Sequence, residues 1–213
     1  MGNPFDPLNV ILLLIAIFGF IRLRMTLGKR TGNEEPLSHK KYSGQIRQDI
    51  EKLSNSKKIN KPKNKEDVLI YLEDNLNSFG KKIFIDGACN AYETILKSYA
   101  EGNLKKIKNI ISKEVYKGFN EALSGRNEKK HKLINELIAF DKAEIIDASI
   151  ERKNALITVE FYTRIITFVL DENQELVEGN KDNPISVVDQ WIFKKPLSDT
   201  GPSWQLISTQ SEG

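Results

Sequence analysis

The chain has 213 residues and a formal net charge of +3, so it can hold one ordinary domain with additional segments. Its single cysteine, Cys89, excludes an intramolecular disulfide and a thiolate metal cluster, and is typical of a protein in a reducing compartment. The only histidines, His39 and His131, lie in polar segments, so we predict no metal site and no cofactor.

The first predicted element is the apolar run Leu8–Ile21, which contains no charge and one polar residue near its start, Asn9. As a helix, its 14 residues span about 21 Å, against a hydrocarbon core of about 30 Å. Arg22 and Arg24 lengthen the usable span, because their stems can lie along acyl chains while their charges reach the headgroups. We predict a membrane anchor in residues 1–27, with an interfacial helix and a short buried helix as the alternatives. The residues predicted to face lipid are Leu8, Val10, Ile11, Leu12, Leu13, Leu14, Ile15, Ile17, Phe18, Phe20 and Ile21.

The charges around this run predict its orientation. Residues 1–21 contain Asp6 and no Lys or Arg, which is the reverse of a cleaved signal peptide. Positive residues follow the run, and positive charge stays on the cytoplasmic side. The rest of the chain is therefore expected in the cytosol, behind a single pass.

Residues 28–65 read as a basic, flexible linker, rich in Lys, Asn, Ser and Gly. From Arg22 to Lys65 the net charge is +9, whereas residues 66–213 carry −5. Basic tracts beside a membrane attract anionic lipid, and this one has a single aromatic residue and no nucleic-acid-binding module, so nucleic acid is not an expected partner. Apolar residues from Tyr42 to Leu53 fall at helical spacing, which fits either a surface helix or no structure at all. The residues predicted to contact anionic lipid are Arg22, Arg24, Lys29, Arg30, Lys40 and Lys41.

Helical periodicity begins near Glu66 and marks the domain predicted for residues 66–213. One amphipathic helix is expected to run to Phe79 and to stop at Gly80, and a second is expected from Ile83 to Ala100. A shorter helix follows, and then one that begins at the cap Ser112 and stops at 124–125. Cys89 lies on or beside the apolar stripe of the second helix, where a core role is expected.

After a charged turn at 126–132 the apolar period changes from helical to two. Strands are predicted over 138–150 and from Ala155 onward, joined by a turn at 151–154, with further strands around Trp191 and at 204–208. Helices first and antiparallel strands afterwards predict an α+β fold, with the helices on one face of a curved sheet.

The strand faces and the stripe of the second helix define a candidate pocket. Bulky aromatics opposite small alanines permit either interdigitation or a cavity. The enzymatic alternative uses Asp189 as a base, with Tyr92 or Tyr162 as the hydrogen-bond donor to an oxyanion. In the competing interpretation Asp189 pairs with Arg164 or Lys194 across the sheet, or caps a backbone group. The pocket residues are Ala88, Ile95, Ile157, Val159, Phe161, Asp189, Trp191 and Phe193.

Several strings of this sequence, taken in order, resemble bacterial members of the Tim-forty-four-like family. The first is R-L-R-M-T-L-G-K-R-T-G-N-E at 22–34, directly after the apolar run. The others are F-I-D-G-A-C-N-A-Y-E-T-I-L-K-S-Y-A-E-G-N-L at 84–104, S-K-E-V-Y-K-G-F at 112–119, V-V-D-Q-W-I-F at 187–193 and W-Q-L-I-S-T at 204–209. The resemblance covers nearly the whole chain except about 35–60.

This resemblance implies a cone of helices against a bent antiparallel sheet, of the nuclear-transport-factor-two-like class, which agrees with the α+β fold expected from the residues. It implies a membrane adaptor and not an enzyme, since the family's namesake ties the mitochondrial import motor to the inner-membrane translocase. The expected partners are anionic membrane lipid and a membrane or chaperone protein, with no prediction of the oligomeric state. The expected location is the inner membrane of a bacterium. The alternative is a small-molecule-binding or isomerase-like enzyme of this fold, held at the membrane.

Overall fold

The computed structural model describes residue 62 and residues 64–212, which comprise the α+β domain. The predicted anchor (1–27) and nearly all of the basic linker, with the lipid-contact residues named above, lie outside these residues. The elements, in chain order, are the helices α3 (Lys65–Asn75), α4 (Lys81–Ala100), η1 (Leu104–Ile107, a 3₁₀ turn) and α5 (Lys113–Glu128), and the strands β1 (Lys132–Glu151), β2 (Asn154–Leu170), β3 (Leu176–Gly179), β4 (Ile185–Pro196) and β5 (Gln205–Glu212).

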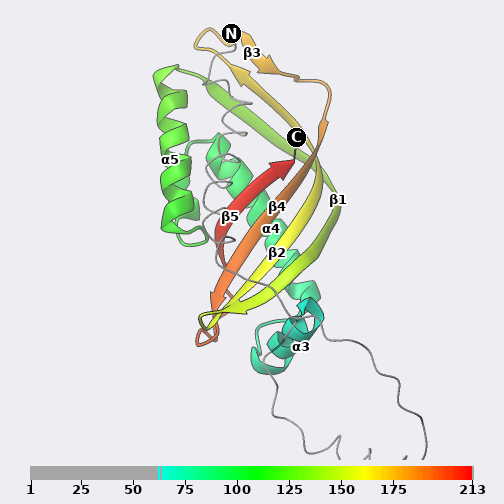
Figure 1. Ribbon diagram of the computed structural model, residues 1–213. Helices are drawn as coiled ribbons and strands as arrows, with labels where there is room; N and C mark the ends of the chain where they lie inside the picture. Colours follow the sequence, from blue (N-terminus) through cyan, green and yellow to red (C-terminus); the bar gives the residue numbers. More distant parts are fainter. Residues whose placement is uncertain (1–61, 63, 213) are drawn as a thin grey trace, which may run out of the picture.

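The strands form one antiparallel sheet in the order β1-β2-β4-β5, with β3 paired to the far end of β2. Figure 1 shows a long, curved sheet with the helices on one side of it and α3 at one end. Helices packed on an antiparallel sheet confirm the α+β prediction. Among the described residues, no helix combines the length and apolar content that a membrane span requires.

The core lies where α4 crosses the sheet. Its helix stripe includes Phe84, Tyr92 and Ile95, all at most 6% exposed. It packs on the alternating buried residues of β2 and β4, whose register sets Val159 opposite Trp191 and Ile157 opposite Phe193. The strict alternation along β2 produces this one-sided face, because successive side chains point to opposite sides of a strand.

Two helix boundaries differ from the predictions. α3 ends at Asn75, not at Gly80, although Leu76 and Phe79 remain buried beyond it. Gly80 instead has extended backbone and begins α4 as its N-cap. The apolar spacing correctly predicts burial, but a buried loop continues that spacing without continuing the helix.

α5 begins as predicted, with the Ser112 hydroxyl accepting from the Val115 N–H, but it runs through the expected stop to Glu128. Arg126 explains the extension. Its guanidinium donates to the carbonyls of Tyr99 and Ala100, the last residues of α4, and lies over the Tyr99 ring. These contacts hold the end of α5 against the end of α4, which local sequence signals do not reveal.

Candidate functional site

A polar pair lies at one end of the apolar core, between α4 and the sheet. The Tyr92 hydroxyl donates to Asp189 Oδ2 at 2.5 Å, and the Thr163 hydroxyl lies 3.3 Å from the same phenol oxygen. Ser211 on β5 also hydrogen bonds to the Asp189 carboxylate. Three strands and one helix therefore supply the four groups of this network.

Burial governs the protonation of this pair. It raises the pKa of Asp189 above its ordinary value, and the hydrogen bonds from Tyr92 and Ser211 only partly offset the rise. Burial also raises the pKa of Tyr92 far above its ordinary value, with the neighbouring Asp189 charge as a second cause. Tyr92 is consequently a neutral donor, and Asp189 is a carboxyl group that resists ionisation.

The surroundings of the pair are aromatic. The Tyr92 ring centroid lies 4.7 Å from that of Trp191, 4.9 Å from Phe161 and 5.5 Å from Phe140. Tyr92 is 1% exposed, so its hydroxyl is enclosed by these rings and by its two polar partners. The arrangement contains the carboxyl group and the tyrosine donor that the enzymatic alternative requires, but the two are already hydrogen bonded to each other.

The expected salt bridge of Asp189 with Arg164 is wrong. Arg164 lies on the other face of the sheet and pairs with Asp141 on β1, with Nε and Oδ1 3.0 Å apart. Tyr162 is also separated from Asp189, since it donates to Glu160 at 2.7 Å. Of the two donors considered, Tyr92 is the one that contacts Asp189.

The other candidate pocket residues lie together on one face, where they form part of the continuous hydrophobic core. Each is at most 6% exposed, and rings from α4, β4 and the loop before β5 interlock over them, as in the 4.9 Å contact of Phe84 with Trp204. Within this set only Asp189 is polar. These core residues are Ala88, Ile95, Ile157, Val159, Phe161, Trp191 and Phe193.

Cys89 is half-buried and packs against the same core. Burial, and secondly the Asp86 charge, raise the pKa of its thiol, so the thiolate is disfavoured. In residues 62 and 64–212 there is no group of three or more His, Cys, Asp or Glu side chains placed to hold a metal ion.

A groove lies beside the core, between the second half of α4 and the first residues of β1. Its volume is about 440 Å³, and its apolar floor includes Leu96, Ala100, Leu133 and Leu137. Charged side chains form its rim: Glu93, Lys97, Glu101, Lys132 and Glu136. The sequence pattern does not predict this groove, because the expected strand begins at 138 and residues 126–132 are expected to form a turn, whereas β1 begins at Lys132.

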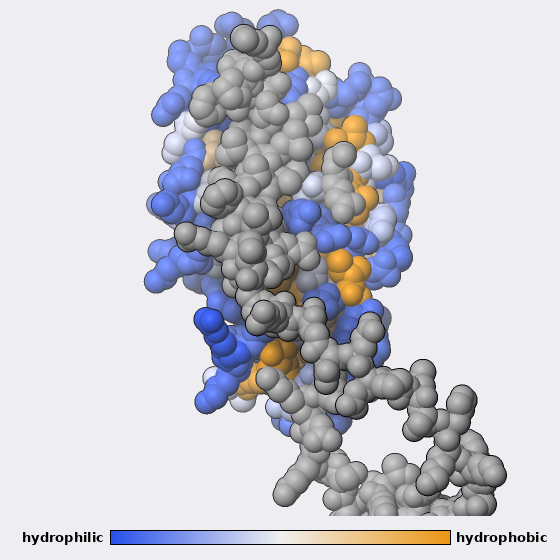
Figure 2. Space-filling model, in the orientation of Figure 1, coloured by the Kyte–Doolittle hydropathy of each residue, from blue (hydrophilic) through white to orange (hydrophobic). Residues whose placement is uncertain are grey.

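The apolar face continues from the groove across the sheet. In register, Leu137 of β1 faces Ile165 of β2, which faces Ile185 of β4. Ile165 is buried but does not belong to the core cluster, and Ile185 is 45% exposed. On the face shown in Figure 2, apolar side chains form separate areas among hydrophilic ones.

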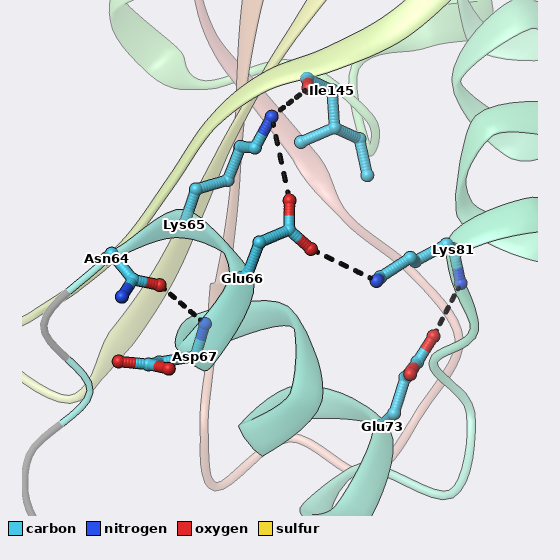
Figure 3. A network of polar contacts seen from close by, with 7 residues as sticks. All are labelled: Asn64, Lys65, Glu66, Asp67, Glu73, Lys81 and Ile145. Carbon is cyan, nitrogen blue, oxygen red and sulfur yellow. Dashed lines mark hydrogen bonds and ion pairs between the residues drawn. The ribbon is translucent and has the colours of Figure 1, made fainter.

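The point where the linker enters the domain is held by the polar contacts drawn in Figure 3. Asn64 caps α3 by accepting from the Asp67 N–H at 2.9 Å. Lys65 donates to the carbonyl of Ile145 on β1 at 3.3 Å. Glu66 lies 3.4 Å from Lys81 at the start of α4. The first residues of the domain thus contact both the sheet and α4.

This architecture belongs to the class of α+β domains in which helices cover one face of an antiparallel sheet. The sequence profile of the Tim44-like domain matches residues 72–211. The chain belongs to the Tim44-like domain family.

Among named relatives, the chain is similar to the mitochondrial import inner membrane translocase subunit TIM44-1 of Arabidopsis thaliana, with 25% identity over 118 residues. That alignment covers 53% of this chain and only 25% of the plant protein. Among solved structures, the intermembrane space region of the chloroplast protein ARC6 superposes with a TM-score of 0.42 and 9% identity, covering 60% of this chain and 95% of that one.

Proposed function

We propose that this protein is a membrane-tethered adaptor of protein translocation or membrane-protein assembly. In this proposal Leu8–Ile21 attaches the chain to the inner membrane of a bacterium, and the basic linker rests on anionic lipid. The α+β domain then receives a protein partner or a lipid on the cytosolic side. The observation that carries the proposal is the Tim44-like domain at 72–211 on a chain whose residues 8–21 carry no charge.

The groove between α4 and β1 is the surface that best fits partner binding. It has an apolar floor and a rim of both charge signs, and such a combination suits an apolar or amphipathic segment better than a small polar substrate. Leu96 on the floor also packs against the core, so the floor is fixed in place by the fold.

An isomerase-like enzyme is the second candidate, and the Tyr92–Asp189 hydrogen bond is the observation in its favour. Catalysis requires that a substrate reach these groups. With Tyr92 1% exposed and bonded to Asp189, a substrate would first have to break this pair and displace the rings around it. We therefore favour binding over catalysis.

Site-specific photocrosslinking in intact cells tests the proposal. A photoreactive side chain at Lys132, on the groove rim, should give a discrete crosslinked protein, whereas one at Lys82, an exposed residue near the start of α4, should not. Identical product patterns at the two positions would contradict a partner site at the groove.

The orientation is tested separately with Ser43→Cys, in the linker. In spheroplasts a membrane-impermeant thiol reagent should not reach this position until the cells are lysed. Labelling of intact spheroplasts would overturn the cytosolic assignment.

A further inference from the structure

We infer that the groove between α4 and β1 is also the docking site of the chain's own apolar segment Leu8–Ile21, when that segment is not in a membrane. This inference rests on the proposed function, because it assigns a second location to the proposed anchor. In this second state the domain covers its own anchor.

The shape of the groove suits a helix. On the α4 side, Glu93, Leu96, Lys97 and Ala100 follow the spacing of one helical face. On the β1 side, Leu133 and Leu137 point to the same face of the strand. Residues 132–137 extend over about 20 Å at 3.3 Å per residue, and Leu8–Ile21 spans about 21 Å as a helix.

Beside Leu137 the apolar floor also widens across the sheet. The strip Leu137, Ile165 and Ile185 carries the apolar face from β1 to β4. α5 packs on β5 and η1, and its last turn is held against the end of α4 by Arg126.

The linker allows the contact. Between Leu27 and Asn64 lie 36 residues, for which a flexible chain has a root-mean-square end-to-end distance of about 30–36 Å. A segment tethered at this range has an effective concentration near the millimolar level, which favours it over a free partner of equal affinity.

The rim of the groove carries three acidic and two basic side chains, a net charge of −1 that is opposite in sign to the residues following the apolar segment. Arg22 and Arg24 follow the apolar segment directly. Glu93 and Glu136 stand exposed on the rim of the groove, within the surface that a docked segment would border. A second copy of the chain or an apolar segment of another protein could bind the same floor. Neither of these is held near the groove by a covalent linker.

Crosslinking of the full chain tests the inference. The test protein carries Cys89→Ala, Ala16→Cys and Lys97→Cys, which places one thiol in the apolar segment and one on the groove rim. The matched control replaces Lys97→Cys by Thr94→Cys, an exposed position on the same helix that does not line the groove. The two proteins differ only at the exposed positions 94 and 97, so we expect equal stability. Thermal unfolding checks this expectation.

With a short bismaleimide in vesicle-free buffer, we expect intramolecular crosslinking at least about tenfold faster in the Lys97→Cys protein, because docking raises the local thiol concentration. Adding phosphatidylcholine vesicles with a minority of phosphatidylglycerol should remove this advantage. Leu137→Asn, on the groove floor, should also remove it, whereas Ile138→Asn, which is exposed at the next position, should not.

Equal rates for the two thiol pairs, or crosslinks formed only between molecules, would overturn the inference; the second result would identify another copy as the occupant. Flotation of the same proteins with the vesicles reports on the anchor independently. Proteins that float without showing the vesicle-free crosslink would leave the proposed function standing and the docking inference refuted.

Discussion

Tyr92 and Asp189, 97 positions apart in sequence, meet in the core through a hydrogen bond of 2.5 Å between the phenol and the carboxylate. This bond joins α4 to the middle of the sheet at the point where the apolar contacts give way to polar ones. Because burial raises the pKa of Asp189, the pair also makes the stability of the domain depend on pH.

The sign of that dependence follows from proton binding. Between the unfolded pKa of Asp189, near 3.8, and its higher folded pKa, the folded state binds more protons than the unfolded state. The contribution of Asp189 to the free energy of unfolding is therefore fully present below pH about 3.8 and is lost as the pH rises through the folded pKa. Asp189→Asn cannot ionise, so its stability relative to the parent should increase as the pH rises across this window. Urea unfolding of both proteins from pH 4 to 8 measures the difference between their free energies of unfolding. A difference that stays constant over this range would show that Asp189 titrates normally.

Trp191→Ala tests whether the predicted pocket residues form a core or line a cavity. Trp191 is 6% exposed and contacts the rings of both Tyr92 and Phe161, so its removal should cost about 3–5 kcal/mol of unfolding free energy. Crosslinking at the groove should persist in the molecules that remain folded, because Trp191 does not line the groove. A small loss of stability with a complete loss of partner binding would instead favour a ligand cavity in the core.

Lys195 fixes the loop that leads to the last strand. Although 1% exposed, its ammonium donates to the carbonyls of Gly201 and Ser203 at 2.6 and 3.2 Å, and lies 3.4 Å from Asp199. Lys195→Met should destabilise the domain by about 1–3 kcal/mol, because the two carbonyls lose their donor. The neighbouring Lys194→Met serves as the control and should change the unfolding free energy little. Equal effects of the two substitutions would show that the buried contacts contribute nothing specific.

Two glycines should respond in opposite directions to alanine. Gly87 is an exposed residue inside α4 with open space around it, so Gly87→Ala should stabilise by about 0.5–1 kcal/mol. Gly179 has φ +84, and an added Cβ would lie 2.3 Å from the Thr167 carbonyl oxygen. Gly179→Ala should therefore destabilise the pairing of β3, which hydrogen exchange at β3 would detect. Thermal unfolding measures the stabilisation expected for Gly87→Ala. A lower melting temperature for this variant would contradict the placement of Gly87 inside a helix.

The parts of the fold that the sequence predicts correctly depend on local signals. The stripe of α4, the Ser112 cap and the turn at 151–154 are each specified by neighbours within a few residues, and all appear in the structure. β3 was missed because its four residues are too short to show a period. The Tyr92–Asp189 bond, the end of α5 and the groove could not be foreseen, since each depends on residues far apart in sequence meeting across the core.

Membrane attachment through residues 1–27, with the linker on anionic lipid, is the central claim of this account. Flotation on a density gradient measures it directly, using the full chain and a chain that lacks residues 1–27. The full chain should float with phosphatidylcholine vesicles even at high salt. The shortened chain should float only with vesicles that contain anionic lipid, and should dissociate from them as salt screens the +7 charge of residues 28–65. A full chain that stays in the dense fraction at high salt would contradict the account.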